Sequence, residues 1–144
     1  MAFRVVLDTS VLVAAIRSDR GASRVLLVGA LEQQYQLLVS VPLMIEYESV
    51  LTRAEHLEAS GLSADDVLAI LDAVAVIAEP VRLAYLWRPV LPDAEDDMVL
   101  ETAVNGRADV LVTFNRRDFE SAGATFAVEI SSPGRAIERM RTSS

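Results

Sequence analysis

Two acidic side chains fall on helix faces that the sequence pattern predicts to be buried, which makes them candidates for chemistry. In the first of these helices, Glu46 lies three residues after Leu43 and four before Val50, so it shares a face with apolar side chains. A buried carboxylate is costly unless it is paired, protonated or bound to a cation. Pairing with an arginine such as Arg53 or Arg24 is the simpler explanation, and binding of a metal ion is the alternative that could support catalysis.

The second acid is Asp96, which shares its predicted helix face with apolar residues three, four and seven positions later. Asp97 lies on a more mixed face, which also carries Glu101. We therefore expect Asp96 to turn inward, with helix capping as its alternative role. For the neighbouring acids Asp93, Glu95 and Asp97 we expect roles as an N-cap or as first-turn acids, which the helix dipole favours.

Two further acids follow predicted strands. Asp8 ends the apolar run over residues 3–7, and Asp118 lies shortly after the apolar run over residues 110–113. Ligands of parallel α/β sheets bind outside the carboxyl ends of the strands, so Asp8, Asn115 and Asp118 should lie near one edge of the sheet. Asp8 could instead cap the following helix, and Asp118 could be an ordinary acid of a turn or of a first helical turn.

These positions depend on an alternation of strands and helices along the chain. Short apolar runs predict strands, and apolar residues three and four apart predict helices. Strands that alternate with helices indicate an α/β domain with a parallel sheet and right-handed crossovers. We expect strands over residues 3–7, 37–41, 75–78, 110–113 and 126–130, a first helix that starts after Thr9 or Ser10 and runs to about residue 17, further helices over about 22–32, 42–53, 63–73, 93–105 and 133–141, and an irregular segment over 84–92.

Composition excludes several other chemistries. The chain of 144 residues has no cysteine and no lysine, because all 13 basic residues are arginine, and His56 is its single histidine. Thiolate metal sites, disulfides, Schiff-base chemistry and a Walker lysine are therefore excluded, and no Gly-x-Ser-x-Gly motif accompanies His56. The missing lysine also counts against receiver domains and haloacid-dehalogenase-like phosphatases.

The chain is acidic, with 21 acids against 13 bases and a formal charge of −8. Nucleic-acid binding usually leaves a basic footprint, so a metal ion or a basic partner would have to supply positive charge. Ordinary solubility explains most of the surface acids. The length and the 52% hydrophobic content predict one domain over residues 1–144. We expect a cytoplasmic protein, because neither a signal peptide nor a membrane-length apolar run is present.

The acids stand in segments that together resemble the PIN domain family. Residues 5–12, VVLDTSVL, resemble the opening strand of PIN domains, which delivers a first acid followed by Thr and Ser or Asn. The segment LMIEY around Glu46 and the segment DAEDDMVL around Asp96 resemble the second and third acidic positions. Residues 112–119, VTFNRRDF, resemble a terminal signature with Asn115 and Asp118. The order and spacing are most similar to the toxin components of toxin–antitoxin systems, the VapC-like proteins.

This resemblance implies a PIN-like α/β/α sandwich and an endoribonuclease that uses Mg²⁺ or Mn²⁺. It implies Asp8 and Asp96 as principal metal ligands, with Glu46 completing the site and Asp118 helping to hold a second ion or its water. Because Asp96 and Asp97 are adjacent, the third position could also shift by one residue. The residues implied to orient these ligands or the substrate phosphate are Thr9, Ser10, Thr113, Asn115 and Arg116.

The resemblance also implies partners, namely an RNA substrate, a second copy of the chain in a homodimer, and a cognate antitoxin that covers the site. A basic antitoxin segment would complement the charge of −8. Two alternatives stay open. One is a PIN-fold interaction module without catalytic activity, and the other is a Mg²⁺-dependent phosphatase or receiver-like domain.

Overall fold

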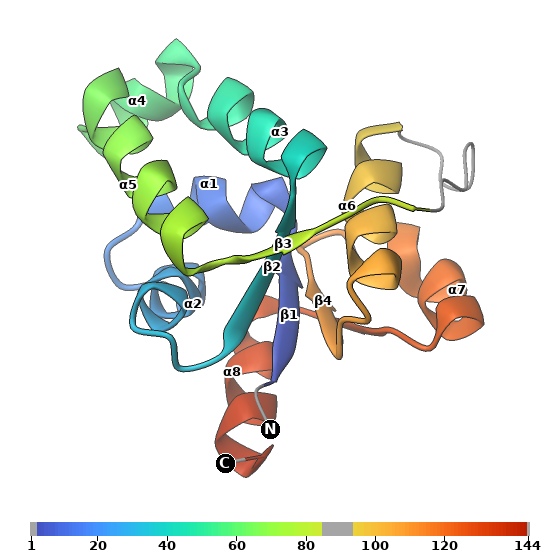
Figure 1. Cartoon of the computed structure of the whole chain (residues 1–144). Helices are drawn as coiled ribbons and strands as arrows, with labels where there is room; N and C mark the ends of the chain where they lie inside the picture. The colour runs from blue at the N-terminus through green and yellow to red at the C-terminus, as the bar shows by residue number, and fades with distance from the viewer. Residues whose placement is uncertain (1–2, 85–93, 144) are drawn as a thin grey trace.

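The computed structural model describes residues 3–84 and 94–143 of the chain (Figure 1). Its strands are β1 (Arg4–Leu7), β2 (Gln36–Ser40), β3 (Glu79–Val81), β4 (Val110–Val112) and β5 (Glu129–Ser131). Its helices are α1 (Thr9–Arg17), α2 (Ala22–Leu31), α3 (Val41–Leu51), α4 (Ala54–Ser60), α5 (Ala64–Ile77), α6 (Ala94–Asn105), α7 (Arg116–Phe126) and α8 (Pro133–Ser143).

The five strands form one parallel sheet in the order β3-β2-β1-β4-β5. The chain builds outward from β1 to β3, returns to the other side of β1 as β4, and ends the sheet with β5. The two halves therefore meet between β1 and β4, where Val5 pairs with Val110 and Leu7 with Val112. Such a switch point opens a crevice at the carboxyl ends of the strands.

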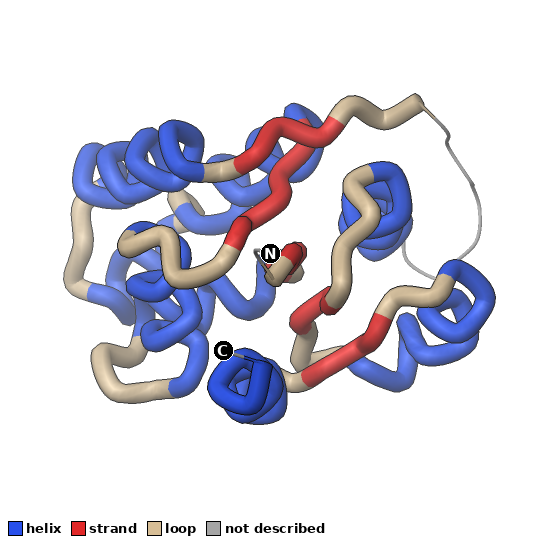
Figure 2. The backbone as a smooth tube through the Cα atoms, turned by 60° about the horizontal axis from the view of Figure 1, so that its bottom comes forward, coloured by secondary structure: helices blue, strands red, loops and turns tan. Residues whose placement is uncertain are grey.

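Helices cover both faces of this sheet, as the end-on view shows (Figure 2). Helices α1 to α5 lie on one side, and α6 and α7 lie on the other. Helix α8 packs against α2 and β4. The predicted PIN-like α/β/α architecture is thereby confirmed.

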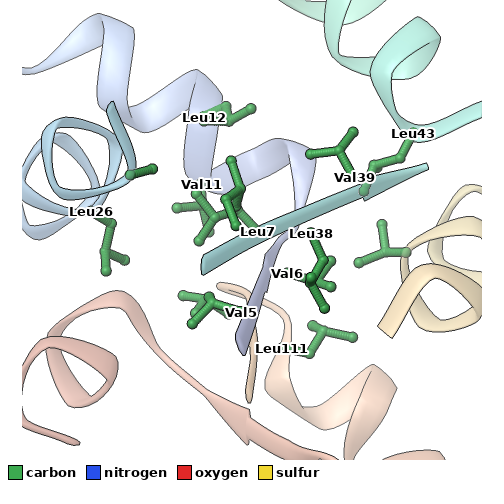
Figure 3. Packing of buried hydrophobic residues seen from close by; sticks show 14 of the residues in the cluster. Val5, Val6, Leu7, Val11, Leu12, Leu26, Leu38, Val39, Leu43 and Leu111 are labelled. Carbon is green, nitrogen blue, oxygen red and sulfur yellow. The ribbon is translucent and has the colours of Figure 1, made fainter. Parts of the chain in front are cut away.

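The central strands β1, β2 and β4 are buried on both faces, which explains their nearly continuous apolar sequences. In β1 the side chains alternate, so that Val5 and Leu7 point toward the α1 and α2 layer while Val6 points toward α6 (Figure 3). Leu26 lies on the first side and Leu111 on the second. Packing on both faces thus holds β1 in place and fixes the position of its carboxyl end.

Two predicted helix starts are confirmed by their caps. Ser40 precedes α3, and its hydroxyl accepts a hydrogen bond from the Leu43 N–H at 3.3 Å, with Pro42 in the first turn. Ser63 precedes α5 and forms a capping box with Asp66, in which each side chain binds the other residue's N–H. The hydrogen bond that the Ser63 N–H donates lowers the pKa of the Asp66 carboxyl, with a smaller contribution from the Ser63 side chain.

The strand predicted over residues 75–78 is wrong, because α5 continues to Ile77 and the strand follows it as Glu79–Val81. Alanine and valine occupy residues 73–76, and such a short apolar run fits a helix as well as a strand. Pro80 lies within β3 rather than ending a strand before it. This is possible because β3 is the edge strand, where a missing N–H removes no central ladder bond.

Two helices were not predicted. Helix α4 follows α3 almost directly and ends at Gly61, whose φ of 75° is the left-handed conformation that glycine adopts readily. Helix α7 occupies residues 116–126, so the strand predicted from residue 126 begins only at Glu129. Its inward face is made of small residues around Phe119, which weakens the apolar pattern in the sequence.

Most of the predicted irregular segment lies outside the described residues, as does Asp93 with its predicted capping role. The helices found over residues 3–84 and 94–143 include none that is long and apolar enough to cross a membrane.

Candidate active site

Asp8 is held at the end of β1 by backbone and side-chain contacts. Its N–H continues the sheet ladder by donating to the Val112 carbonyl at 2.9 Å, and its side chain is only 5% exposed. Its Oδ2 accepts hydrogen bonds from the Ser10 hydroxyl at 3.0 Å and the Thr113 hydroxyl at 2.8 Å. Although Asp8 occupies the N-cap position of α1, its side chain makes no capping hydrogen bond. The capping alternative therefore does not explain this carboxylate.

Thr113 connects the ends of the two strands that flank the switch point. Its buried hydroxyl donates its single proton to Asp8 and accepts the N–H of Asn115 at 2.9 Å. The direction of both hydrogen bonds is fixed, because the Asn115 N–H can only donate. One hydroxyl thus orients the Asp8 carboxylate and the start of the loop that leads to Asn115.

Tyr47 ties α3 to the same strand end. It is completely buried, and its hydroxyl donates to the carbonyl of Leu7, the residue before Asp8. Burial, with a smaller contribution from the negative charge of Asp8, raises the pKa of Tyr47 well above its ordinary value. The phenol therefore stays protonated and remains a donor. Because Glu46 is adjacent in α3, this bond sets the distance between the helix that carries Glu46 and the strand that carries Asp8.

A second buried contact ties α3 to α6. The Ser40 hydroxyl, which caps α3, lies 2.7 Å from the Thr102 hydroxyl in α6. The Thr102 hydroxyl also donates to the Met98 carbonyl at 2.9 Å. The proton of Ser40 therefore supplies the bond between the two hydroxyls. The helices that carry Glu46 and Asp96 are thus joined directly to each other.

These contacts bring three of the predicted acids to one pocket of about 210 Å³. Asp8 comes from the end of β1, Glu46 from α3 and Asp96 from the first turn of α6. Asp8 and Asp96 are buried, and Glu46 is half-buried. The pocket is lined by Asp8, Thr9, Ser10, Val13, Glu46, Val50, Arg53, Asp96 and Asn115.

The remaining predicted residues lie elsewhere. Thr113 is buried behind Asp8, to which it donates. Arg116 and Asp118 belong to the first turn of α7, where Arg116 is half-buried and Asp118 is exposed. Neither is among the described residues that line the pocket. The structure therefore brings Asn115 to the acids but does not bring Asp118 to them.

Asp97 corrects the sequence-based interpretation of α6. A capping or first-turn role on a mixed face was expected, yet Asp97 is 1% exposed and more deeply buried than Asp96 at 9%. Glu101, one turn further along, is also 1% exposed. Helix α6 contacts β1, β2, β4, α3 and α7, so more than one of its faces is covered. The sequence signal was present in Leu100 and Val104, which lie three and seven residues after Asp97 and so place apolar side chains on its side of the helix as well.

The arginine-pairing explanation for Glu46 gains no support from the two arginines considered. Arg24 directs its Nε to the Ala15 carbonyl at 2.6 Å. Arg53 lines the pocket, but among residues 3–84 and 94–143 no carboxylate forms an ion pair with either arginine.

The donors at the pocket fit a hard divalent cation by their chemistry. Carboxylate and hydroxyl oxygens are the ligands that Mg²⁺ and Mn²⁺ prefer, and the pocket supplies only such side-chain donors beside one amide and one guanidinium. Within the described parts of the chain, however, no three acidic or histidine side chains are gathered closely enough to form a metal-binding group. The oxygen donors of the pocket are therefore of the type that a divalent cation prefers. The carboxylates of Asp8, Glu46 and Asp96 are not close enough together in this structure to surround one ion.

A sequence model of the PIN domain matches residues 4–117, which include every residue that lines the pocket. The chain therefore belongs to the PIN domain family. PIN domains are commonly nucleases and generally use divalent metal ions. Asp118 lies one residue beyond the matched segment. A comparison with curated proteins found no match for this chain.

Proposed function

We propose that this protein is a metal-dependent endoribonuclease whose active site is the pocket around Asp8, Glu46 and Asp96. The observation that carries the proposal is the convergence of three acids from separate elements on one pocket at the switch point of the sheet. Asp8 supports it most strongly, because two hydroxyls orient its buried carboxylate. If Asp8 served only as the N-cap of α1, these two hydrogen bonds to its carboxylate would not be needed.

In this proposal Asp8 and Asp96 bind Mg²⁺ or Mn²⁺, and Glu46 completes the site directly or through a water molecule. The ion supplies an activated water and stabilises the charge that develops on the phosphodiester. Ser10 and Thr113 hold the Asp8 carboxylate in position, while Thr9 and Asn115 face the pocket and can orient ligands or phosphate. Asp118 and Arg116 would act from outside the pocket. The exposed carboxylate of Asp118 would help to hold a second ion or its water, and the neighbouring Arg116 would contact phosphate.

We further propose that the protein is the toxin of a toxin–antitoxin system, that it acts on RNA in the cytoplasm as a homodimer, and that a cognate antitoxin covers the pocket. The support is the resemblance of the four motifs and the charge of −8, which a basic antitoxin segment would complement. We also propose that residues 1–144 form one domain, since β5 pairs with β4 beyond the matched segment.

Cleavage of single-stranded RNA in Mg²⁺ or Mn²⁺ tests the enzymatic proposal. The wild-type protein should cleave, a chelator should stop it, and Asp8→Asn or Asp96→Asn should abolish it. Asp72→Asn is the matched control, because Asp72 is an exposed acid of α5 that does not line the pocket. Wild-type rates for both Asp8→Asn and Asp96→Asn would contradict the proposal. If the Asp97→Asn protein were inactive and the Asp96→Asn protein active, the metal ligand would be Asp97 instead of Asp96.

A PIN-fold module without catalytic activity is the second candidate. It is favoured by the absence of a gathered three-carboxylate group among the described residues. This candidate predicts RNA binding that neither a chelator nor Asp8→Asn changes, and no cleavage in either metal. Metal-dependent cleavage by the purified wild-type protein would exclude it.

A further inference from the structure

Arg53 is a basic side chain in an otherwise acidic pocket, and no role has yet been assigned to it. Glu46 and Val50 are four residues apart in α3 and share a face of that helix, whereas Arg53 follows the C-cap Thr52 and is the N-cap of α4. All three line the pocket that also contains Asp8 and Asp96. Arg53 itself follows the last turn of α3, where its N–H still donates to the Val50 carbonyl at 3.1 Å.

The charge of Arg53 is available to a ligand. It is the only basic side chain among the described residues that line the pocket, and it is exposed. Although carboxylates share the pocket, no described carboxylate forms an ion pair with Arg53. A guanidinium presents paired N–H donors that match two phosphate oxygens, and it stays charged at every physiological pH.

The position of Arg53 beyond α3 indicates which phosphate it can contact. Glu46 lies within α3, whereas Arg53 follows that helix at the start of α4, at a different part of the pocket lining. The scissile phosphate of the proposed reaction would lie at the acids, so a side chain from this position meets a neighbouring part of the backbone. Val13 and Val50 line the same pocket and supply apolar side chains beside the acids and Arg53.

We propose that Arg53 binds a backbone phosphate of single-stranded RNA next to the scissile phosphate, and so sets the direction in which the strand crosses the pocket. The inference rests on the proposed function for the identity of the substrate. In this proposal Arg53 supplies part of the positive charge that an acidic protein needs in order to bind the phosphates of RNA. Each neutralised phosphate of a single strand contributes about −0.7 to the slope of log Kobs, the observed association constant, against log salt concentration.

RNA binding tests this assignment without requiring cleavage. The full chain carrying Asp96→Asn is titrated with a fluorescent single-stranded oligoribonucleotide over a series of salt concentrations. Adding Arg53→Ala should weaken binding about tenfold, as expected for loss of a charge-assisted hydrogen bond, and should flatten the salt slope by about 0.7. Arg53→Lys keeps the charge but not the paired donors, so it should retain the slope and lose part of the affinity.

The matched control is Arg20→Ala, because Arg20 is exposed and lies outside the pocket lining. It should leave affinity and slope unchanged. An Arg53→Ala protein with the affinity and slope of its parent would overturn the proposal, as would a parent that binds no RNA at low salt.

Kinetics in the chain without Asp96→Asn separates this proposal from the proposed function. Arg53→Ala should raise KM with little change in kcat, because the contact is the same in the bound substrate and in the transition state. A fall in kcat alone would place Arg53 at the scissile phosphate and overturn the assignment to a neighbour. If the wild-type protein binds RNA through Arg53 but never cleaves it, the nuclease proposal fails and the Arg53 contact stands.

Discussion

The amino and carboxyl ends of the parallel strands differ in how their charged side chains are arranged. At the amino end, Arg4 forms a two-pronged pair with Glu79, with distances of 3.0 Å from Nη1 and 2.5 Å from Nη2, and also donates to the Gly106 carbonyl. The Asp109 carboxylate accepts the Arg4 N–H at 2.8 Å. Acids and a base from distant parts of the chain therefore neutralise one another there.

At the carboxyl end, three carboxylates share one pocket, and Arg53 is the only opposite charge among the described lining residues. The hydroxyl groups of Ser10 and Thr113 orient Asp8. A hydroxyl fixes the direction of a carboxylate without cancelling its charge. The comparison teaches that the amino end pairs its charges across distant elements of the fold, whereas the carboxyl end gathers several carboxylates at one pocket, which the proposed function assigns to a metal ion.

The largest expected difference is between Asp8 and Asp118. Asp8→Asn should lower RNA cleavage by more than the roughly 10- to 100-fold that loss of an outer-shell contact to a metal ligand costs. Asp118→Asn should reduce cleavage by less than about threefold, since an exposed acid outside the pocket contributes through water at most. Cleavage rates at saturating Mg²⁺ measure both. Equal losses in the two variants would show that the acids of α7 belong to the site.

Replacement of Thr113 tests whether the hydroxyl orients the Asp8 carboxylate. Thr113→Val keeps the shape and removes the donor, so the affinity for Mn²⁺ should fall about 10-fold or more. Thr113→Ser restores the hydroxyl and should recover most of that affinity. Calorimetric titration with Mn²⁺ measures the effect. If Thr113→Val and Thr113→Ser bound Mn²⁺ equally well, the orienting role would be excluded.

Tyr47→Phe removes the bond between α3 and the end of β1. The free energy of unfolding should fall by about 1 kcal/mol, the usual net contribution of a hydrogen bond, and denaturant unfolding measures it. The affinity for Mn²⁺ should fall as well, because the helix that carries Glu46 is no longer fixed to the strand that carries Asp8. A loss of stability with unchanged Mn²⁺ affinity would assign Tyr47 to the core alone.

The smallest expected effect concerns the amino end. The Arg4 guanidinium lowers the pKa of the Glu79 carboxyl, so Glu79 stabilises the fold fully above its ordinary pKa of about 4.3. This contribution is lost as the pH falls through the lowered pKa of the folded state. The pair is partly exposed, so Glu79→Gln should cost less than about 1 kcal/mol near neutral pH and nothing at pH 2. Unchanged RNA cleavage is expected, and a loss of cleavage would break the distinction between the two ends.

Much of the carboxyl end could be predicted from sequence because its signals are local. The apolar run before Asp8, the stripe around Glu46 and the face of Asp96 each follow from the spacing of side chains within one element. The contacts that join these elements could not be predicted in this way. Neither Thr113 nor Tyr47 has a sequence neighbour that reveals its hydrogen bond to β1 or to Asp8.

The errors have the same physical origin. Asp97 was placed on a mixed face with a capping or first-turn role because one helix was considered alone, whereas α6 is covered on several sides. The proline in β3 is acceptable only because that strand is at the edge, which depends on the order of all five strands. Helix α7 presents Ala122 and Gly123 inward, and small residues leave little apolar signal.

Metal binding at the pocket tests the central claim most directly. Crystals of the wild-type protein soaked in Mn²⁺ should show anomalous density in contact with the carboxylates of Asp8 and Asp96, and the Asp8→Asn protein should show none under the same conditions. Calorimetry in solution should likewise show that the wild-type protein binds Mn²⁺ more tightly than the Asp8→Asn protein. The absence of any ion at these two carboxylates, in a protein that still cleaves RNA with Mn²⁺, would contradict the account.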